Sequence, residues 1–155
     1  MAKLDTGDKA PDFSLVDQNG NQVNLSDFKD RKLLLYFFPK ALTSGCTMQA
    51  LEVNAAREDL AADGTTVAGI SPDTPATLKK FGDKHGLGFL LLSDADHAVS
   101  DAYGVWGEKS MYGRKYLGIT RSSFLIDENG RIVQAWYKVS PKDTVPKALK
   151  EIRKP

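Results

Sequence analysis

Apolar residues along this chain fall into short runs and helical spacings that alternate with one another. The most apolar run, residues 33–38, contains six apolar or aromatic side chains and ends at Pro39, as is typical of a central strand covered on both faces. A helix over residues 47–62, ended by Gly64, is predicted by four apolar residues at helical spacing: Ala50, Val53, Ala56 and Leu60.

The same pattern continues on both sides of this strand and helix. Asn19-Gly20 predicts a tight turn between two N-terminal strands, and Thr74-Pro75 predicts a helix start. Strands are predicted over residues 13–16, 22–25, 66–71, 89–92, 123–126 and 132–137, and further helices over residues 75–85, 95–103 and 142–153. Alternating strands and helices imply parallel pairing, so the predicted fold class is α/β, a mixed central sheet flanked by helices with an N-terminal β-hairpin.

Composition limits the size and the partners of the molecule. A chain of 155 residues with 41% hydrophobic content suits a single domain over residues 1–155. The 21 basic and 20 acidic residues are interspersed, which gives no basic surface for nucleic acid or membrane lipid. No apolar stretch approaches the ~18 residues of a membrane span and the first residues lack an apolar signal core, so a cytoplasmic location is expected.

The only cysteine, Cys46, follows the central strand by a short polar loop. Thr43 and Ser44 are good N-cap residues, so Cys46 is predicted in the first helical turn, where unpaired N–H groups and the helix dipole favour a thiolate. A helix terminus contributes only ~0.3–2 kcal/mol, so a reactive thiolate also needs a cation nearby. The alternative is that Cys46 is an inert, small apolar residue of the core.

Four basic residues could supply this cation: Lys40, Arg57, Arg114 and Arg121. Arg121 is preferred because it begins an apolar strand, where an arginine needs a partner, and its planar fork can hold both a thiolate and an oxygen. The alternative is an arginine that faces solvent at a strand end. The two histidines, His85 and His97, have no metal-ligand spacing and are interpreted as surface residues without a metal.

Residues of the loop between the central strand and the following helix could bind a substrate that contains an O–O bond. Thr43 can place its hydroxyl beside the sulfur, and the N–H groups of Gly45 and Cys46 can face the substrate at the helix entrance. Pro39 can fix the direction in which the loop leaves the strand and has no N–H to compete for the oxygens. Pro39 could equally be an ordinary strand terminator, and Thr43 a simple helix cap.

Pro39, Thr43 and Cys46 form the pattern P-x-x-x-T-x-x-C, and three other segments match the same family in order: Gly7-Asp8-Lys9-Ala10-Pro11-Asp12-Phe13, Tyr103-Gly104-Val105-Trp106-Gly107-Glu108-Lys109 and Gly118-Ile119-Thr120-Arg121-Ser122-Ser123-Phe124-Leu125-Ile126. Through these motifs the chain resembles the peroxiredoxins, most closely the bacterioferritin comigratory protein or Q-type subgroup. The resemblance implies a thioredoxin-like fold and reduction of hydrogen peroxide and organic hydroperoxides. It implies no metal or organic cofactor, and it implies a monomer.

In this reaction Cys46 would become a sulfenic acid that a thiol must reduce. Many relatives carry a second, resolving cysteine, at positions that correspond here to Leu51, the neighbourhood of residues 81–82, or Ser100. None is present, so the resemblance implies a one-cysteine peroxidase resolved by thioredoxin, glutaredoxin or a small thiol. We interpret this absence as natural, although serine at position 100 is nearly isosteric with cysteine.

Two other functions are weighed against the peroxidase. A thioredoxin-type disulfide reductase needs C-x-x-C, whereas this chain has Cys46-Thr47-Met48-Gln49. A catalytically silent binding module could retain the fold, but the presence of Thr43, Cys46 and Arg121 together argues against it.

Overall fold

The computed structural model describes residues 3–154, and in that range seven strands form one mixed sheet with the order β2-β1-β5-β4-β3-β8-β9. β3, β4 and β5 are parallel to one another, and the remaining neighbours pair antiparallel. The strands are β1 (Ser14–Asp17), β2 (Gln22–Asn24), β3 (Lys32–Phe37), β4 (Thr65–Ser71), β5 (Leu90–Ser93), β8 (Ser122–Ile126) and β9 (Ile132–Trp136). The predicted mixed α/β sheet with an N-terminal hairpin is therefore confirmed.

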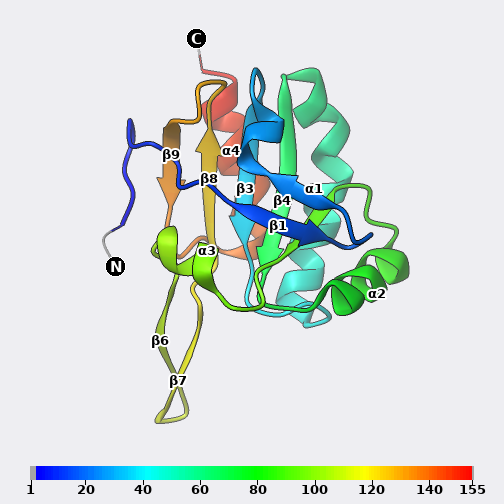
Figure 1. Cartoon of the computed structure of the whole chain (residues 1–155), viewed down its shortest axis with the longest axis vertical. Helices are drawn as coiled ribbons and strands as arrows, with labels where there is room; N and C mark the ends of the chain where they lie inside the picture. The colour runs from blue at the N-terminus through cyan, green and yellow to red at the C-terminus, as the bar shows by residue number, and fades with distance from the viewer. Residues whose placement is uncertain (1–2, 155) are drawn as a thin grey trace.

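The central strand β3 contributes to two hydrophobic cores. Leu33, Leu35 and Phe37 point to one face of the sheet, whereas Leu34 and Tyr36 point to the other. The second face is covered by α1 (Ser44–Ala62), α2 (Pro75–His85) and α4 (Thr144–Ile152), and α3 (Ala98–Ala102) lies on the first face (Figure 1). Coverage on both sides explains why β3 is almost entirely apolar.

Most predicted boundaries agree with the structure to within a few residues. The helix predicted over residues 75–85 is α2, which begins at the Thr74 cap and ends at the left-handed Gly86. The predicted C-terminal helix is divided into a 3₁₀ turn, η2 (Pro141–Asp143), and α4, and a second 3₁₀ turn, η1 (Leu25–Phe28), follows β2. Among the helices of residues 3–154, none is long and apolar enough to cross a bilayer.

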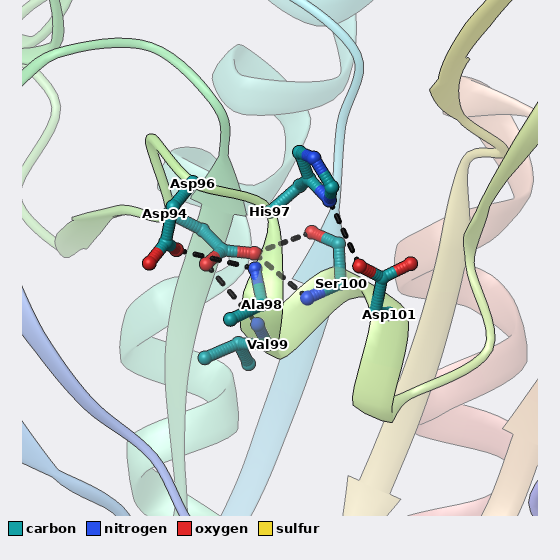
Figure 2. Close-up of polar contacts among 7 residues, drawn as sticks. All are labelled: Asp94, Asp96, His97, Ala98, Val99, Ser100 and Asp101. Atoms are coloured by element: carbon teal, nitrogen blue, oxygen red, sulfur yellow. Dashed lines mark hydrogen bonds and ion pairs between the residues drawn. The ribbon is translucent and has the colours of Figure 1, made fainter.

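The helix predicted over residues 95–103 is wrong in its first part, because only Ala98–Ala102 are helical. Figure 2 shows the reason: the buried carboxylate of Asp94 accepts hydrogen bonds from the Val99 and Ser100 N–H groups and from the Ser100 hydroxyl. His97 takes a left-handed backbone conformation before the helix. Asp94 thus satisfies the first turn of α3 and fixes where the helix begins.

The β-hairpin over residues 106–119 was not predicted. It consists of β6 (Trp106–Met111) and β7 (Arg114–Ile119), which pair antiparallel and extend away from the main sheet (Figure 1). Its root is fixed to the body, because Trp106 stacks on His97 with ring centroids 4.1 Å apart and Ile119 is buried. Its tip is exposed, and β7 leads directly to Arg121.

Candidate active site

Cys46 lies in the first turn of α1, at the edge of the sheet where β3 ends. The first intrahelical bond runs from the Thr47 N–H to the Thr43 carbonyl at 2.9 Å, so the N–H groups of residues 44–46 precede the helical ladder. The free Cys46 thiol is only 2% exposed and packs in the core that contains Tyr36 and Ala50. A helix N-terminus favours negative charge whereas burial opposes it, so a thiolate here needs a cation nearby.

Arg121 is the cation that the fold brings to this sulfur. Its Nη2 donates to Cys46 Sγ at 3.4 Å. The other predicted candidates lie elsewhere, since Lys40 and Arg114 are exposed and Arg57 donates to the Asn54 carbonyl at 2.8 Å. Arg121 is half-buried and faces the sulfur, so the alternative of a solvent-facing arginine does not describe it.

Gln49 holds the other side of the guanidinium and was not anticipated from the sequence. Arg121 Nη1 donates to Gln49 Oε1, and Gln49 Nε2 donates to Thr144 Oγ1 at 2.8 Å. Gln49 is fully buried and lies one helical turn after Cys46. A buried glutamine three residues after Cys46, on the same helix face, is the signal that could have found it. The cysteine, the arginine and α4 thus belong to one polar network.

The loop between β3 and α1 is tied down by Asp73, which was also missed. One Asp73 carboxylate oxygen accepts from the Ala41 N–H at 2.7 Å and from the Ser71 hydroxyl at 2.8 Å. Pro39 is half-buried at the start of this loop, directly after Phe38, whose N–H donates to the Ile70 carbonyl. The loop therefore has a fixed shape on which Thr43 and Cys46 are presented.

Thr43 occupies the N-cap position of α1, but its side chain does not cap the helix. The hydroxyl donates instead to the Lys40 carbonyl at 2.8 Å, which closes the loop on itself. Within residues 3–154 no hydrogen bond joins the Thr43 hydroxyl to Cys46. Because the hydroxyl proton is used on Lys40, the lone pairs of the Thr43 oxygen remain available at the exposed mouth of the loop.

Gly45 makes room for the arginine. A Cβ atom at this position would lie 3.3 Å from Arg121 Nη2 and 3.8 Å from Pro141 Cγ. The first distance is shorter than most Cβ contacts, so a side chain here would displace the guanidinium that bonds to Cys46. The absence of a side chain at position 45 is thus part of the geometry of the site.

Tyr36 lies beneath the site with its hydroxyl fully buried, and in the described part of the chain that hydroxyl has no hydrogen-bond partner. Burial raises the pKa of Tyr36, the Cys46 sulfur adds to the rise, and Arg121 opposes it. The ring packs closely against Gly69 of β4, where an added Cβ would lie 2.9 Å from Tyr36 Cζ. Tyr36 therefore remains a neutral phenol beside Cys46 and the Arg121 guanidinium.

The two histidines lie half-buried rather than on the open surface, and both pack on aromatic rings. His85 meets Phe81 edge-on at 5.5 Å, and His97 stacks on Trp106 while its Nδ1 lies 2.8 Å from an Asp101 carboxylate oxygen. Among residues 3–154, no group of three histidine, cysteine or acidic side chains is placed to hold a metal ion.

The whole chain, and not only this site, has close relatives. A sequence profile of the AhpC/TSA family matches residues 6–135. The chain belongs to the AhpC/TSA family of peroxiredoxins. It is 52% identical to peroxiredoxin Bcp of Escherichia coli K12 over 132 residues, 85% of both chains, and 50% identical to the putative peroxiredoxin bcp of Haemophilus influenzae over 143 residues, 92% of both chains.

Solved structures place this peroxiredoxin in the subgroup of the bacterioferritin comigratory proteins, also called peroxiredoxin Q. The bacterioferritin comigratory protein of Xanthomonas campestris superposes with a TM-score of 0.86 at 35% identity, covering 91% of this chain and 90% of its own. A peroxiredoxin Q mutant of Xylella fastidiosa superposes with a TM-score of 0.92 at 32% identity, covering 99% and 98%. The thioredoxin-like fold and the Bcp or peroxiredoxin Q subgroup are thereby confirmed, and the chain is a thiol-dependent hydroperoxide reductase.

Proposed function

We propose that this peroxiredoxin reduces hydrogen peroxide and organic hydroperoxides by a one-cysteine mechanism, with Cys46 as the nucleophile and an external thiol as the reductant. The observation that supports this most is the 3.4 Å hydrogen bond from Arg121 Nη2 to the buried sulfur of a cysteine in the first turn of α1. The relative from X. campestris is described for its alkyl peroxide reduction activity, which supports organic hydroperoxides as substrates.

In the first step the Cys46 thiolate attacks one peroxide oxygen and the O–O bond breaks. The sulfur is oxidised to a sulfenic acid, while the departing oxygen takes the electron pair and then a proton, leaving as water or an alcohol. Arg121 would stabilise the thiolate and the departing oxygen, because its guanidinium presents several donors in one plane. The N–H groups at the start of α1, that of Gly45 among them, would add further donors to the peroxide.

Thr43 and Pro39 would shape the substrate side of the site. The Thr43 hydroxyl donates to Lys40, so its oxygen can accept a hydrogen bond from the hydroperoxide O–H and hold that same oxygen toward the sulfur. Pro39 would form a wall without a competing N–H group. Gly45 would leave space for the guanidinium and the peroxide together.

The second half of the reaction requires thiols from outside, because Cys46 is the only cysteine. One thiol condenses with the sulfenic acid to a mixed disulfide and releases water, and a second thiol then reduces that disulfide to regenerate Cys46. Thioredoxin, glutaredoxin or a small thiol would serve as reductant, which suits a monomeric, single-domain enzyme in the reducing cytoplasm. Position 100 is unsuited to a resolving cysteine, because Ser100 is fully buried and its hydroxyl donates to Asp94 at 2.7 Å.

Stopped-flow tryptophan fluorescence with one equivalent of hydrogen peroxide tests the first step, followed by trapping with dimedone. We expect one dimedone adduct per chain at Cys46, and no rapid peroxide consumption by Cys46→Ser. Dimedone is needed because the exposed Met48 and Met111 can also gain an oxygen atom. Peroxide consumption by Cys46→Ser at the wild-type rate would refute Cys46 as the nucleophile, whereas a wild-type protein that consumes no peroxide would favour a catalytically silent module.

Turnover tests the reductant. The wild-type protein should consume many equivalents of peroxide when thioredoxin with its reductase, glutaredoxin or glutathione is supplied, and only one equivalent without a thiol. A protein that oxidises once and is not reduced by any of the three would contradict the proposed external resolution.

A further inference from the structure

A second cation, Lys109, approaches the site from the β6–β7 hairpin. In the register of the hairpin, Lys109 lies opposite Tyr116, so both side chains occupy one face, and Lys115 lies on the other. The Lys109 Nζ donates to the Ile119 carbonyl at 2.7 Å, two residues before Arg121. Through this hydrogen bond, a side chain of the hairpin that extends from the sheet in Figure 1 contacts the backbone of the segment that leads to Arg121.

The position of Lys109 is fixed by its neighbours. Its aliphatic chain passes over Gly118, where an added Cβ would lie 3.4 Å from Lys109 Cδ, and its ammonium group lies 5.9 Å from the centre of the Tyr116 ring. The segment after it is also held, because the Thr120 N–H donates to the Val105 carbonyl at 2.8 Å. A lysine held in this way contributes a charge of defined position.

The electrostatic surroundings connect Lys109 to the reacting groups. Partial burial lowers the pKa of Lys109, Arg121 acts in the same direction, and the Cys46 sulfur opposes both. Such interactions are mutual, so a cation that is stabilised by the sulfur also stabilises negative charge on the sulfur. The remaining charges of the hairpin are directed elsewhere: Glu108 and Lys115 pair with each other at 3.5 Å on the opposite face, and Arg114 lies at the exposed tip.

We propose that Lys109 is a positioning residue for peroxide reduction, which holds the segment leading to Arg121 through the Ile119 carbonyl and adds a second positive charge to the Cys46 site. This inference rests on the proposed function, since it assumes that Cys46 reacts as a thiolate. It adds a functional role for the hairpin, no residue of which, Lys109 included, forms a hydrogen bond to the sulfur within residues 3–154.

The test uses Lys109→Met and Lys109→Gln, with Lys109→Arg as the conservative variant and Lys115→Met as the matched control on the other face. The rate of Cys46 alkylation by iodoacetamide is measured against pH, together with kcat/KM for hydrogen peroxide. For Met and Gln we expect the pH midpoint of alkylation to rise by ~0.5–1 unit and kcat/KM at neutral pH to fall ~3–10-fold, because a partly exposed charge acts more weakly than a buried one.

Lys109→Arg should remain within about twofold of the wild type, because it retains the charge. Lys115→Met should match the wild type. Glutamine also retains a donor for the Ile119 carbonyl, so its variant reports on the charge even if the methionine variant folds poorly. A pH midpoint for Lys109→Gln equal to that of the wild type overturns the proposal, even if kcat/KM falls. Failure of the proposed function is distinguished by a wild-type protein that does not consume peroxide.

Discussion

Gln49→Glu is the substitution that most sharply separates the geometry of the site from its charge. Glutamate has nearly the same shape as glutamine and still offers an oxygen to Arg121 Nη1, so the guanidinium should keep its place. The new carboxylate, however, would compete with the Cys46 sulfur for the same cation. A carboxylate cannot replace the donation from Gln49 Nε2 to Thr144 Oγ1.

The size of the effect follows from the hydrogen-bonded path between the two acceptors. Both acceptors bond to one guanidinium, so the carboxylate oxygen and the sulfur lie within ~8 Å of each other, where two like charges repel by ~2 kcal/mol at an effective dielectric constant near ~20. This energy corresponds to a rise of ~1.5 units in the pH midpoint of Cys46 alkylation. The peroxidase kcat/KM at neutral pH should fall by ~10-fold or more, because less of the sulfur is a thiolate.

The assay is the rate of alkylation by iodoacetamide between pH 4 and pH 10, with the peroxide reaction followed in parallel by tryptophan fluorescence. Gln22→Glu is the matched control, because Gln22 is exposed on the edge strand β2 and the same charge there is far from the site in the sheet order. An alkylation profile for Gln49→Glu that coincides with that of Gln22→Glu would show that the guanidinium does not couple the two positions, and the reasoning would fail.

Two further substitutions test the packing around the site. Tyr36→Phe removes a buried hydroxyl that lacks a partner within residues 3–154, so the free energy of unfolding in urea should stay the same or rise by up to ~1 kcal/mol; a loss above that amount would mean that the hydroxyl has a partner. Gly45→Ala should displace Arg121 and lower kcat/KM ~3–10-fold with the midpoint of urea unfolding unchanged, because only the 3.3 Å approach to Nη2 is affected. Wild-type kcat/KM in Gly45→Ala would show that the close fit has no role, and Gly107→Ala, where an added Cβ meets no atom within 4 Å, controls for the loss of a glycine.

Local patterns were sufficient to predict the elements that carry the site. The apolar run ending at Pro39, the helix formers after Cys46 and the basic residue at the start of an apolar strand are all features of neighbouring residues. They led to β3, to α1 and to Arg121 as the preferred cation. Each of these three predictions uses the burial of a segment, and the periodicity of apolar residues indicates burial directly.

The missed features depend on contacts between distant residues. Gln49 bonds to Thr144, 95 positions away, and Asp73 bonds to a loop 32 positions earlier, so neither role is visible in its own segment. The β6–β7 hairpin was missed because most of its residues are exposed, which removes the apolar alternation by which strands are recognised. The shortened α3 follows from side-chain bonds to Asp94, which override the helix propensity of the preceding residues.

The central claim is that Arg121 keeps the Cys46 sulfur anionic and stabilises the breaking O–O bond. The most direct measurement is the second-order rate constant of Cys46 with hydrogen peroxide in Arg121→Met, compared with the wild type across the pH range of alkylation. We expect the pH midpoint to rise by ~1–3 units and, above that midpoint, a remaining rate deficit of ~100-fold, because the guanidinium also stabilises the departing oxygen. A variant that alkylates and reacts with peroxide as the wild type does would contradict the account.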